Sequence, residues 1–307
     1  MTIQLRQAAI GANLQRRARL INAVRDFFVQ SAFLEVETPV RIPAPAPEAH
    51  IHAQESGDWF LHPSPELCMK RLLAAGYERI FQICRCFRKD ERGRRHLPEM
   101  TLLEWYVTGW DYLELMNQCE EFIGYLAERL NGGPELIYQR HTVDLRPPWD
   151  RLSVDDAFRR YSGMTAQQAL DGNRFDAIMG QTIEPRLGFQ RPVFLYDYPA
   201  RRGALARIKP SNPSVAERFE LYIAGLELCN AFTELIDPTE QRERFKMENR
   251  ARKEKGQPIY PTADPFLHSL EMMPPAAGNA LGLDRLVMLF TDAESIDDVI
   301  AFTPEEL

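Results

Sequence analysis

The spacing of apolar residues divides the chain into helical and extended segments. Between Gln15 and Gln30, apolar side chains recur three to four residues apart, which predicts an amphipathic helix whose buried face carries Leu20, Val24, Phe27 and Phe28. Residues 33–37 follow as a short run typical of a strand, which Thr38 and Pro39 close. A loop restricted by several prolines comes next.

The strongest extended pattern lies between residues 80 and 107. Ile80–Phe87 is a continuous apolar run, as in a buried strand. In Met100–Val107 the side chains alternate with period two, so one face carries Met100, Leu102, Glu104 and Tyr106. Burying the Glu104 carboxylate in such a strand is costly unless it meets a cation.

The loop between these strands is densely charged and contains Arg88, Arg92, Arg94, Arg95 and His96. Guanidinium groups donate paired hydrogen bonds that suit phosphate oxygens. Together with the buried acid that follows, the loop favours a nucleotide beside a cationic small molecule. The alternative from these residues alone is a solvated hairpin tip above a structural salt bridge.

Acidic side chains gather a second time between Glu217 and Leu235, where apolar residues surround Glu220, Glu227, Asn230 and Glu234. Residues 227, 230 and 234 would share one face of a helix. The aromatic and β-branched surroundings instead favour a strand, with a bulge near residues 229–231 that brings Glu227 and Glu234 together. Such carboxylates suit nucleotide-bound Mg²⁺ or a buried ammonium group, and an acidic structural network is the alternative.

Helix signals mark several other segments. Asp111 with Glu114 predicts a capped helix that ends at Gly132, and Ser64-Pro65-Glu66 predicts another helix start. Residues 134–190 are interpreted as an insertion packed on the rest of the chain. Val193–Tyr196 predicts a strand, and residues 237–255 predict a helix. In residues 278–289, glycines in a strand allow a ligand close to the backbone, and Asp284 predicts a helix N-cap.

Composition narrows the class of protein. The chain has 307 residues, of which 45% are hydrophobic and 26% charged, as in an ordinary globular protein. The net charge of −7 argues against a general nucleic-acid-binding surface. No apolar run approaches the ~20 residues of a membrane-spanning helix, and residues 1–21 lack the apolar core of a signal peptide.

Cysteine and histidine usage gives no metal prediction. The 5 cysteines include no CxxC pair, and their odd number indicates reduced thiols in a cytoplasm. His50, His52 and His62 have no cysteine or carboxylate at ligand spacing along the chain, so we do not predict a metal site there.

The charged loop and the strand after it resemble motif 2 of the class II aminoacyl-tRNA synthetases, most closely of the lysyl branch. Arg88 falls where that motif binds the α-phosphate and His96 where it reaches the γ-phosphate, and the PE-x-T-x-x-E-x-Y continuation from Pro98 to Tyr106 also fits. The helix and strand before residue 39 resemble motif 1, the dimer interface of that family. Residues 278–289 resemble motif 3, whose arginine, here Arg285, stacks on adenine.

The resemblance implies a set of site residues. The stretch ELCNAFTEL, residues 227–235, is similar to the lysyl-branch pattern E-x-x-N-x-F-S-E-L and implies that Glu220 and Glu227 hold Mg²⁺. The implied catalytic residues are Arg88 and Arg285. The implied ATP contacts are Arg88, Lys89, Asp90, His96, Leu97, Met100, Glu227, Leu228, Gly282 and Arg285. The implied amino-acid contacts are Ser64, Pro65, Glu66, Glu104, Tyr106, Asn230, Glu234 and Ala280.

Two departures from a full lysyl-tRNA synthetase point to one branch of the family. An N-terminal anticodon-binding domain is missing before motif 1, and Ala280 replaces a motif 3 glycine. Both resemble the stand-alone paralogues that attach (R)-β-lysine to a lysine of translation elongation factor P. The Ala280 methyl group would exclude α-lysine while admitting the β isomer. Asp90, Leu97 and Met100 depart even from that family, which predicts weaker adenine contacts.

The resemblance therefore implies an α+β fold with an antiparallel sheet flanked by helices, in a single catalytic domain over residues 1–307 and in a homodimer. It implies a cytoplasmic ligase that uses ATP and Mg²⁺ to activate (R)-β-lysine for transfer to elongation factor P, with tRNA and membranes not expected as partners. The alternatives are an enzyme that transfers lysine to tRNA and a non-catalytic paralogue that binds a lysine-like ligand.

Overall fold

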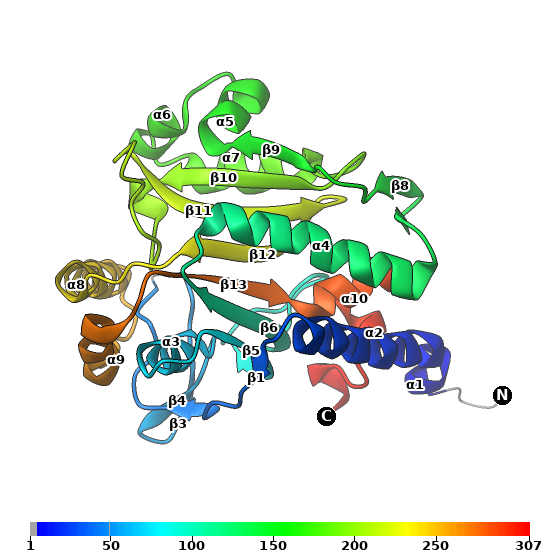
Figure 1. Cartoon of the computed structure of the whole chain (residues 1–307), viewed down its shortest axis with the longest axis horizontal. Helices are drawn as coiled ribbons and strands as arrows, with labels where there is room; N and C mark the ends of the chain where they lie inside the picture. The colour runs from blue at the N-terminus through cyan, green and yellow to red at the C-terminus, as the bar shows by residue number, and fades with distance from the viewer. Residues whose placement is uncertain (1–4, 49) are drawn as a thin grey trace.

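The computed structural model describes residues 5–48 and 50–307 and is built around an eight-stranded sheet (Figure 1). From edge to edge, the strands are β1 (Leu34–Glu35), β5 (Arg79–Phe87), β6 (Glu99–Thr108), β13 (Ala276–Gly282), β12 (Leu226–Thr233), β11 (Val215–Ile223), β10 (Val193–Pro199) and β9 (Asp150–Ser153). Neighbours from β5 to β10 run antiparallel, while β1 and β9 pair in parallel at the edges. The predicted α+β class is confirmed.

Smaller elements complete the chain. Two small sheets consist of β2 (Arg41–Ile42), β4 (Trp59–Leu61) and β3 (Gln54–Ser56), and of β7 (Glu135–Tyr138) and β8 (His141–Asp144). The α-helices are α1 (Arg6–Ala9), α2 (Gly11–Gln30), α3 (Glu66–Ala74), α4 (Tyr112–Asn131), α5 (Val154–Ser162), α6 (Ala166–Asp171), α7 (Phe175–Ile178), α8 (Pro238–Glu254), α9 (Asp264–Ser269) and α10 (Leu283–Thr291). Short π and 3₁₀ turns are η1 (Met179–Ile183), η2 (Glu184–Arg186), η3 (Ala200–Arg202), η4 (Leu270–Met272), η5 (Ile296–Val299) and η6 (Pro304–Glu306). Within the described ranges, no helix is long and apolar enough to cross a membrane.

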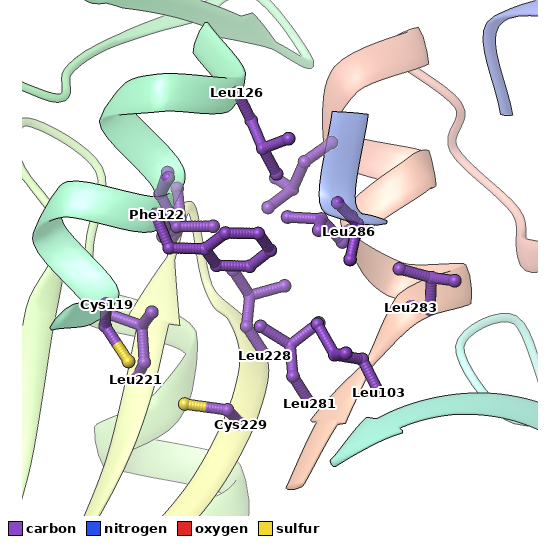
Figure 2. Packing of buried hydrophobic residues seen from close by; sticks show 14 of the residues in the cluster. Leu103, Cys119, Phe122, Leu126, Leu221, Leu228, Cys229, Leu281, Leu283 and Leu286 are labelled. Carbon is purple, nitrogen blue, oxygen red and sulfur yellow. The ribbon is translucent and has the colours of Figure 1, made fainter. Parts of the chain in front are cut away.

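One face of the central sheet is sealed by α2, α4 and α10, which lie in front of it in Figure 1. The β6 side chains Leu103 and Trp105 are buried toward these helices. Figure 2 shows Phe122 of α4 and Leu286 of α10 in the same apolar cluster as Leu281 of β13. Because apolar packing closes this face, a polar site on the sheet has room only on the opposite face.

The opposite face carries the alternate side chains of β6, as its period-two pattern predicts. Tyr106 belongs to a second core with Leu73 of α3 and Phe266 of α9, and its neighbour on the strand face, Glu104, is fully buried. In Figure 1, α3, α8 and α9 gather near one end of the sheet strands. Side chains from this face of the sheet, among them Leu102 and Glu104, line cavities.

The segment predicted as an insertion packs on one edge of the sheet, at the top of Figure 1. Its strand β9 extends the sheet beside β10, and α5 begins at the predicted N-cap Ser153. Phe158 of α5 stacks on Phe175 of α7, with ring centroids 4.7 Å apart, in a core that includes Leu195 of β10. That residues 134–190 form an insertion in a single domain stays a prediction.

The acidic stretch after residue 217 is a hairpin and not the single bulged strand that we predicted. β11 and β12 are joined by Ala224 and Gly225, whose φ angles of 50° and 72° turn the chain within two residues. The register shift falls at Leu228 of β12, between the pairs Leu221–Cys229 and Tyr222–Glu227, one residue before the predicted range 229–231. The single glycine was a weak turn signal beside the continuous apolar run around it.

Other boundaries are partly corrected. α10 begins at Leu283 with Gly282 at its N-cap, so Asp284 does not cap it. Tertiary partners hold Asp284 instead: its carboxylate accepts the Thr101 N–H at 2.7 Å and lies 2.6 Å from Arg17 Nη1. α2 begins earlier than predicted, and only Leu34–Glu35 of the strand predicted over residues 33–37 is paired. The Asp111 capping box of α4 is confirmed.

Candidate active site

Two adjoining cavities open on the free face of the sheet. The larger measures about 710 Å³ and is lined by the loop after β5 and by β6, β12 and the start of α10. The smaller measures about 80 Å³ and lies beside the start of α3. Arg88, Asn230 and Ala280 line both cavities. Ligands bound in the two cavities would therefore be neighbours, and these three residues would lie between them.

The larger cavity gathers most residues predicted to bind ATP or Mg²⁺ from segments far apart in the chain: Arg88, His96, Leu97, Met100, Glu220, Glu227, Leu228, Gly282 and Arg285. Arg285 lies in the first turn of α10. Its Nη1 donates to the Glu227 carbonyl oxygen at 2.8 Å and lies 3.4 Å from Glu227 Oε2, while its Nε donates to the Arg95 carbonyl oxygen at 3.1 Å. These contacts fix the guanidinium group at the cavity wall.

His96 is a hydrogen-bond acceptor beside that guanidinium group. Its Nε2 accepts from Arg285 Nη2 at 2.6 Å. Burial, followed by the positive charges of Arg285 and Arg88, lowers the pKa of His96 to about 4. The imidazole is therefore neutral near pH 7, and anionic phosphate groups would favour its protonated, donating form.

Three carboxylates, those of Glu184, Glu220 and Glu227, line another part of the larger cavity. Glu220 accepts hydrogen bonds from the hydroxyls of Tyr198 at 2.5 Å and Tyr222 at 2.7 Å, and burial followed by the charge of Glu227 raises its pKa. Burial, then repulsion from Glu220 and Glu227, raises the pKa of Glu184 to about 7. Oxygen ligands that repel one another in this way fit a hard divalent cation.

Around the smaller cavity, buried acids converge on a lysine. Lys70 Nζ lies 2.5 Å from Glu66 Oε1 and 2.5 Å from Glu234 Oε2, and Lys70 is 0% exposed. Glu234 Oε1 has no hydrogen-bond partner among the described residues. Burial raises the pKa of Glu234 to about 8, against the opposing charge of Lys70. Lys70 alone therefore does not fully stabilise the ionised form of the Glu234 carboxylate.

Glu104 lines the smaller cavity and is fully buried. It accepts hydrogen bonds from Ser64 Oγ at 2.6 Å and from the Tyr106 hydroxyl at 2.8 Å. Burial, then the charge of Glu66, raises the pKa of Glu104 to about 8. A Cβ at Gly278 would overlap the Tyr106 ring and lie 2.5 Å from Glu234 Oε1. Glycine at this β13 position is therefore what lets the acid and the tyrosine approach the backbone.

Four predicted contacts lie outside the cavity linings. One is Glu234, whose Oε1 lies beside Gly278 of the smaller cavity's lining. Lys89 and Asp90 are exposed on the loop, and Pro65 occupies the N-cap position of α3. Glu91 lines the larger cavity instead, with its Oε1 3.8 Å from Arg88 Nη1. Asp90 has a φ of 67°, so the chain turns there before Glu91. We therefore carry Glu91 and not Asp90 into the nucleotide site.

The sequence also left functional-site residues unnoticed. Lys70 stands four residues after Glu66, and this helical ion-pair spacing was the signal for it. Arg218 lies two residues before Glu220, on the same strand face, and donates to it at 2.6 Å. No sequence signal marked Glu184, which comes from the least patterned part of the chain.

Comparison with known proteins agrees with this arrangement. A family model described as tRNA synthetases class II (D, K and N) matches residues 1–306. The chain belongs to this family. As a class II synthetase-like protein, it is an ATP-dependent ligase, and ligases of this class use ATP with a divalent metal.

Similar curated proteins of this family fall into two groups. The chain is 40% identical to the elongation factor P–(R)-β-lysine ligase of Erwinia tasmaniensis, over 95% of either chain. It is 38% identical to the ligase of the same name from Haemophilus influenzae, over 94% of each. It is 39% identical to the lysine–tRNA ligase of Moorella thermoacetica, over 93% of this chain and 64% of that protein. The resemblance read from the motifs is confirmed.

Proposed function

We propose that this enzyme activates (R)-β-lysine as an aminoacyl-adenylate and transfers it to a lysine side chain of translation elongation factor P. The names of relatives that match over nearly their whole length support this substrate and acceptor. An acceptor that works in translation also implies a cytoplasmic enzyme.

The observation that carries the proposal is that the two cavities meet at Arg88. With ATP in the larger cavity and the amino acid in the smaller one, a carboxylate oxygen reaches the α-phosphorus beside this guanidinium group. The new bond joins the carboxylate oxygen to the α-phosphorus, and the bond from that phosphorus to the bridging oxygen breaks, which releases pyrophosphate. Arg88 stabilises the negative charge that develops there.

The smaller cavity suits an amino acid that carries two ammonium groups. Glu66, Glu104 and Glu234 are carboxylates, while Lys70 is the cation that pairs with two of them. Burial raises the pKa values of Glu104 and Glu234, so a bound ammonium group would stabilise their charged forms. We assign the side-chain ammonium to Glu104 and Glu234, and the amino group near the carboxylate to Glu66.

Ala280 lies where the choice between lysine isomers would be made. It lines both cavities and pairs with Glu104 and Asn230 on the neighbouring strands. Its methyl group narrows the junction beside the reacting carboxylate. An amino group on the α-carbon is closest to that junction, whereas one on the β-carbon lies a bond further away.

The oxygen-rich wall of the larger cavity supports a role for Mg²⁺. Glu220 and Glu227 would hold the ion, and Glu184 stands near both. When bound, Mg²⁺ would neutralise phosphate charge during adenylate formation. Arg285 and His96 would position the phosphate tail, and Met100 and Leu97 would contact the base from β6 and the loop before it.

In the second step, the amine of the acceptor lysine attacks the carbonyl carbon of the adenylate. The bond from that carbon to the phosphate oxygen breaks and AMP leaves, while the attacking nitrogen loses a proton. We propose no covalent intermediate on the enzyme. If a tRNA hydroxyl attacked in place of the amine, the enzyme would transfer the amino acid to tRNA. This is the second candidate function, and the similarity to a lysine–tRNA ligase supports it.

The test follows both steps with the same enzyme preparation. ATP–pyrophosphate exchange should be faster with (R)-β-lysine than with α-lysine, and Ala280→Gly should raise the exchange with α-lysine. Labelled β-lysine should then pass to purified elongation factor P and not to bulk tRNA. Efficient charging of tRNA would support the second candidate, and an absence of exchange with either isomer would contradict the proposed ligase substrate.

A further inference from the structure

Two thiols of β5 and the imidazole of His62, which directly follows β4, lie together outside the linings of the two cavities. Cys84 and Cys86 are two residues apart on β5, so they share a face, and their Sγ atoms are 3.7 Å apart. A ring nitrogen of His62 and the two sulfurs all lie within 4.8 Å of one another. His62 is 1% and Cys86 0% exposed, while Cys84 is half-buried.

The imidazole is oriented as in a metal ligand. His62 Nε2 lies 2.7 Å from the Arg85 carbonyl oxygen. A carbonyl oxygen only accepts, so Nε2 carries the proton and the lone pair is on Nδ1. A ligating histidine in proteins commonly donates its other ring N–H to a backbone carbonyl in this way, which fixes its tautomer.

The sulfur geometry fits a tetrahedral metal better than a disulfide. With Zn–S bonds of about 2.3 Å, the edge between two sulfurs of a tetrahedron is about 3.8 Å, and the observed separation is 3.7 Å. Residues two apart on a strand have Cα atoms about 6.7 Å apart, near the upper limit of about 6.8 Å for a disulfide. The same pair of thiols is thus spaced for one shared ion.

We propose that Cys84, Cys86 and His62 bind one Zn²⁺ ion through two Sγ atoms and Nδ1. Binding displaces the thiol protons to solvent, so two thiolates and a neutral imidazole surround the ion and the centre carries no net charge. A neutral centre is much less costly to bury than an isolated charge. The fourth tetrahedral position falls to water on the side of Cys84, the ligand with partial exposure.

The ion would join two segments that the active site needs. His62 stands two residues before Ser64, which contacts Glu104, and Cys86 stands two residues before Arg88. The Phe87 N–H already donates to the His62 carbonyl oxygen at 3.0 Å. A shared metal would add a second link between the segment that begins α3 and the strand that carries Arg88. The site does not depend on which amino acid the enzyme activates.

The test uses the full chain after removal of metal by a chelator, with Zn²⁺ and Co²⁺ as probes. We expect one equivalent of Zn²⁺ per chain with a Kd below about 1 μM. Co²⁺ should give the intense visible bands of a tetrahedral site and a thiolate charge-transfer band in the near ultraviolet. Competition by Zn²⁺ should remove both.

Single substitutions separate this site from other thiols. Cys86→Ser should weaken Zn²⁺ binding more than about 100-fold, since loss of an outer-shell partner alone costs roughly 10–100-fold. Cys68→Ser, which changes a thiol outside the cluster, is the matched control and should bind as the unsubstituted chain does. Circular dichroism checks each fold, and His62→Gln replaces Cys86→Ser if that variant does not fold. Binding that survives in Cys84→Ser/Cys86→Ser, or the absence of a thiolate–Co²⁺ band, would overturn the site.

Discussion

At the scale of single residues, Glu234 is the side chain whose environment most calls for a ligand. It is buried against Lys70, yet its Oε1 has no partner among the described residues. Glu234→Gln should lower exchange with (R)-β-lysine about 100-fold or more, because removing one partner of a buried ion pair costs ~3–5 kcal/mol. Initial rates across amino-acid concentrations will separate this loss into its KM and kcat parts.

The fold of that variant is protected by Glu66, which still pairs with Lys70. Glu121→Gln, on the exposed side of α4, is the matched control and should leave exchange unchanged. If Glu234→Gln keeps the KM for the amino acid of the unsubstituted enzyme, the ammonium group does not bind at Glu234.

Met100 provides a residue-scale test of where the adenine lies. It lines the larger cavity from β6, and a thioether offers dispersion but no aromatic platform. Base stacking on an aromatic ring is worth about 1–3 kcal/mol, so Met100→Phe should lower the KM for ATP roughly tenfold. Asp90→Glu is the control and should change it little, because Asp90 is exposed outside the lining. A larger effect from Asp90→Glu would place the base on the loop and not over β6.

At the scale of elements, the sequence predicted features that depend on local patterns, such as which side chains of a strand share a face. Alternation along β6 predicted that Glu104 and Tyr106 share one face. In the structure, the intervening Leu103 and Trp105 pack into the apolar core on the other face. Prediction from the sequence failed where tertiary contacts override local signals: Asp284 looked like a cap but binds Arg17 and the Thr101 N–H. These contacts join residues far apart in the chain, so no local window contains them.

His62 and the two cysteines of β5 also show that a local window misses contacts between distant residues. Spacing along the chain gave His62 no ligand partner, whereas the fold brings it beside Cys84 and Cys86. The strand alternation that pairs the two thiols was readable from the sequence. The path of the chain through β4, which brings His62 next to these thiols, could not be predicted from the sequence.

Two buried carboxylates of the amino-acid pocket should make the stability of the folded enzyme depend on pH. The pKa values of Glu104 on β6 and Glu234 after β12 are raised from 4.5 to about 8 by burial. The folded protein therefore binds more protons than the unfolded chain between pH 4.5 and 8, and its free energy of unfolding should fall as pH rises through this window. Denaturant titrations at pH 5 and pH 8 measure that change.

A diammonium substrate should reverse this effect by favouring the charged carboxylates. Binding of (R)-β-lysine near pH 7 should release up to about two protons, and the enzyme should be stabilised more by the ligand at pH 8 than at pH 6. Calorimetric titration in buffers of different ionisation enthalpy counts the protons. Glu104→Gln should release fewer, and proton uptake on binding would contradict the charged pocket.

At the scale of the whole molecule, the sheet has an apolar face covered by helices, a face that carries the two cavities, and a free edge at β1. β1 is the edge strand beside β5, and exposed apolar side chains surround it: Val29 is 61%, Leu34 50% and Val40 41% exposed. An edge strand with an apolar surround invites pairing with another chain. In Figure 1, β1 lies below β5 and β6, at the lower edge of the sheet.

This edge supports the predicted homodimer, in which the same surface of each copy meets its partner. We expect light scattering after size-exclusion chromatography to give twice the chain mass at micromolar concentration. Leu34→Glu should produce monomers, because a stable interface of about 1,600 Å² has an apolar centre that a buried charge would disrupt. Ile137→Glu alters an equally exposed apolar residue on β7, 62% exposed, and should leave the dimer intact. If Leu34→Glu stays dimeric while Ile137→Glu dissociates, the interface lies on the β7–β8 hairpin, and the edge at β1 is protected by its short length alone.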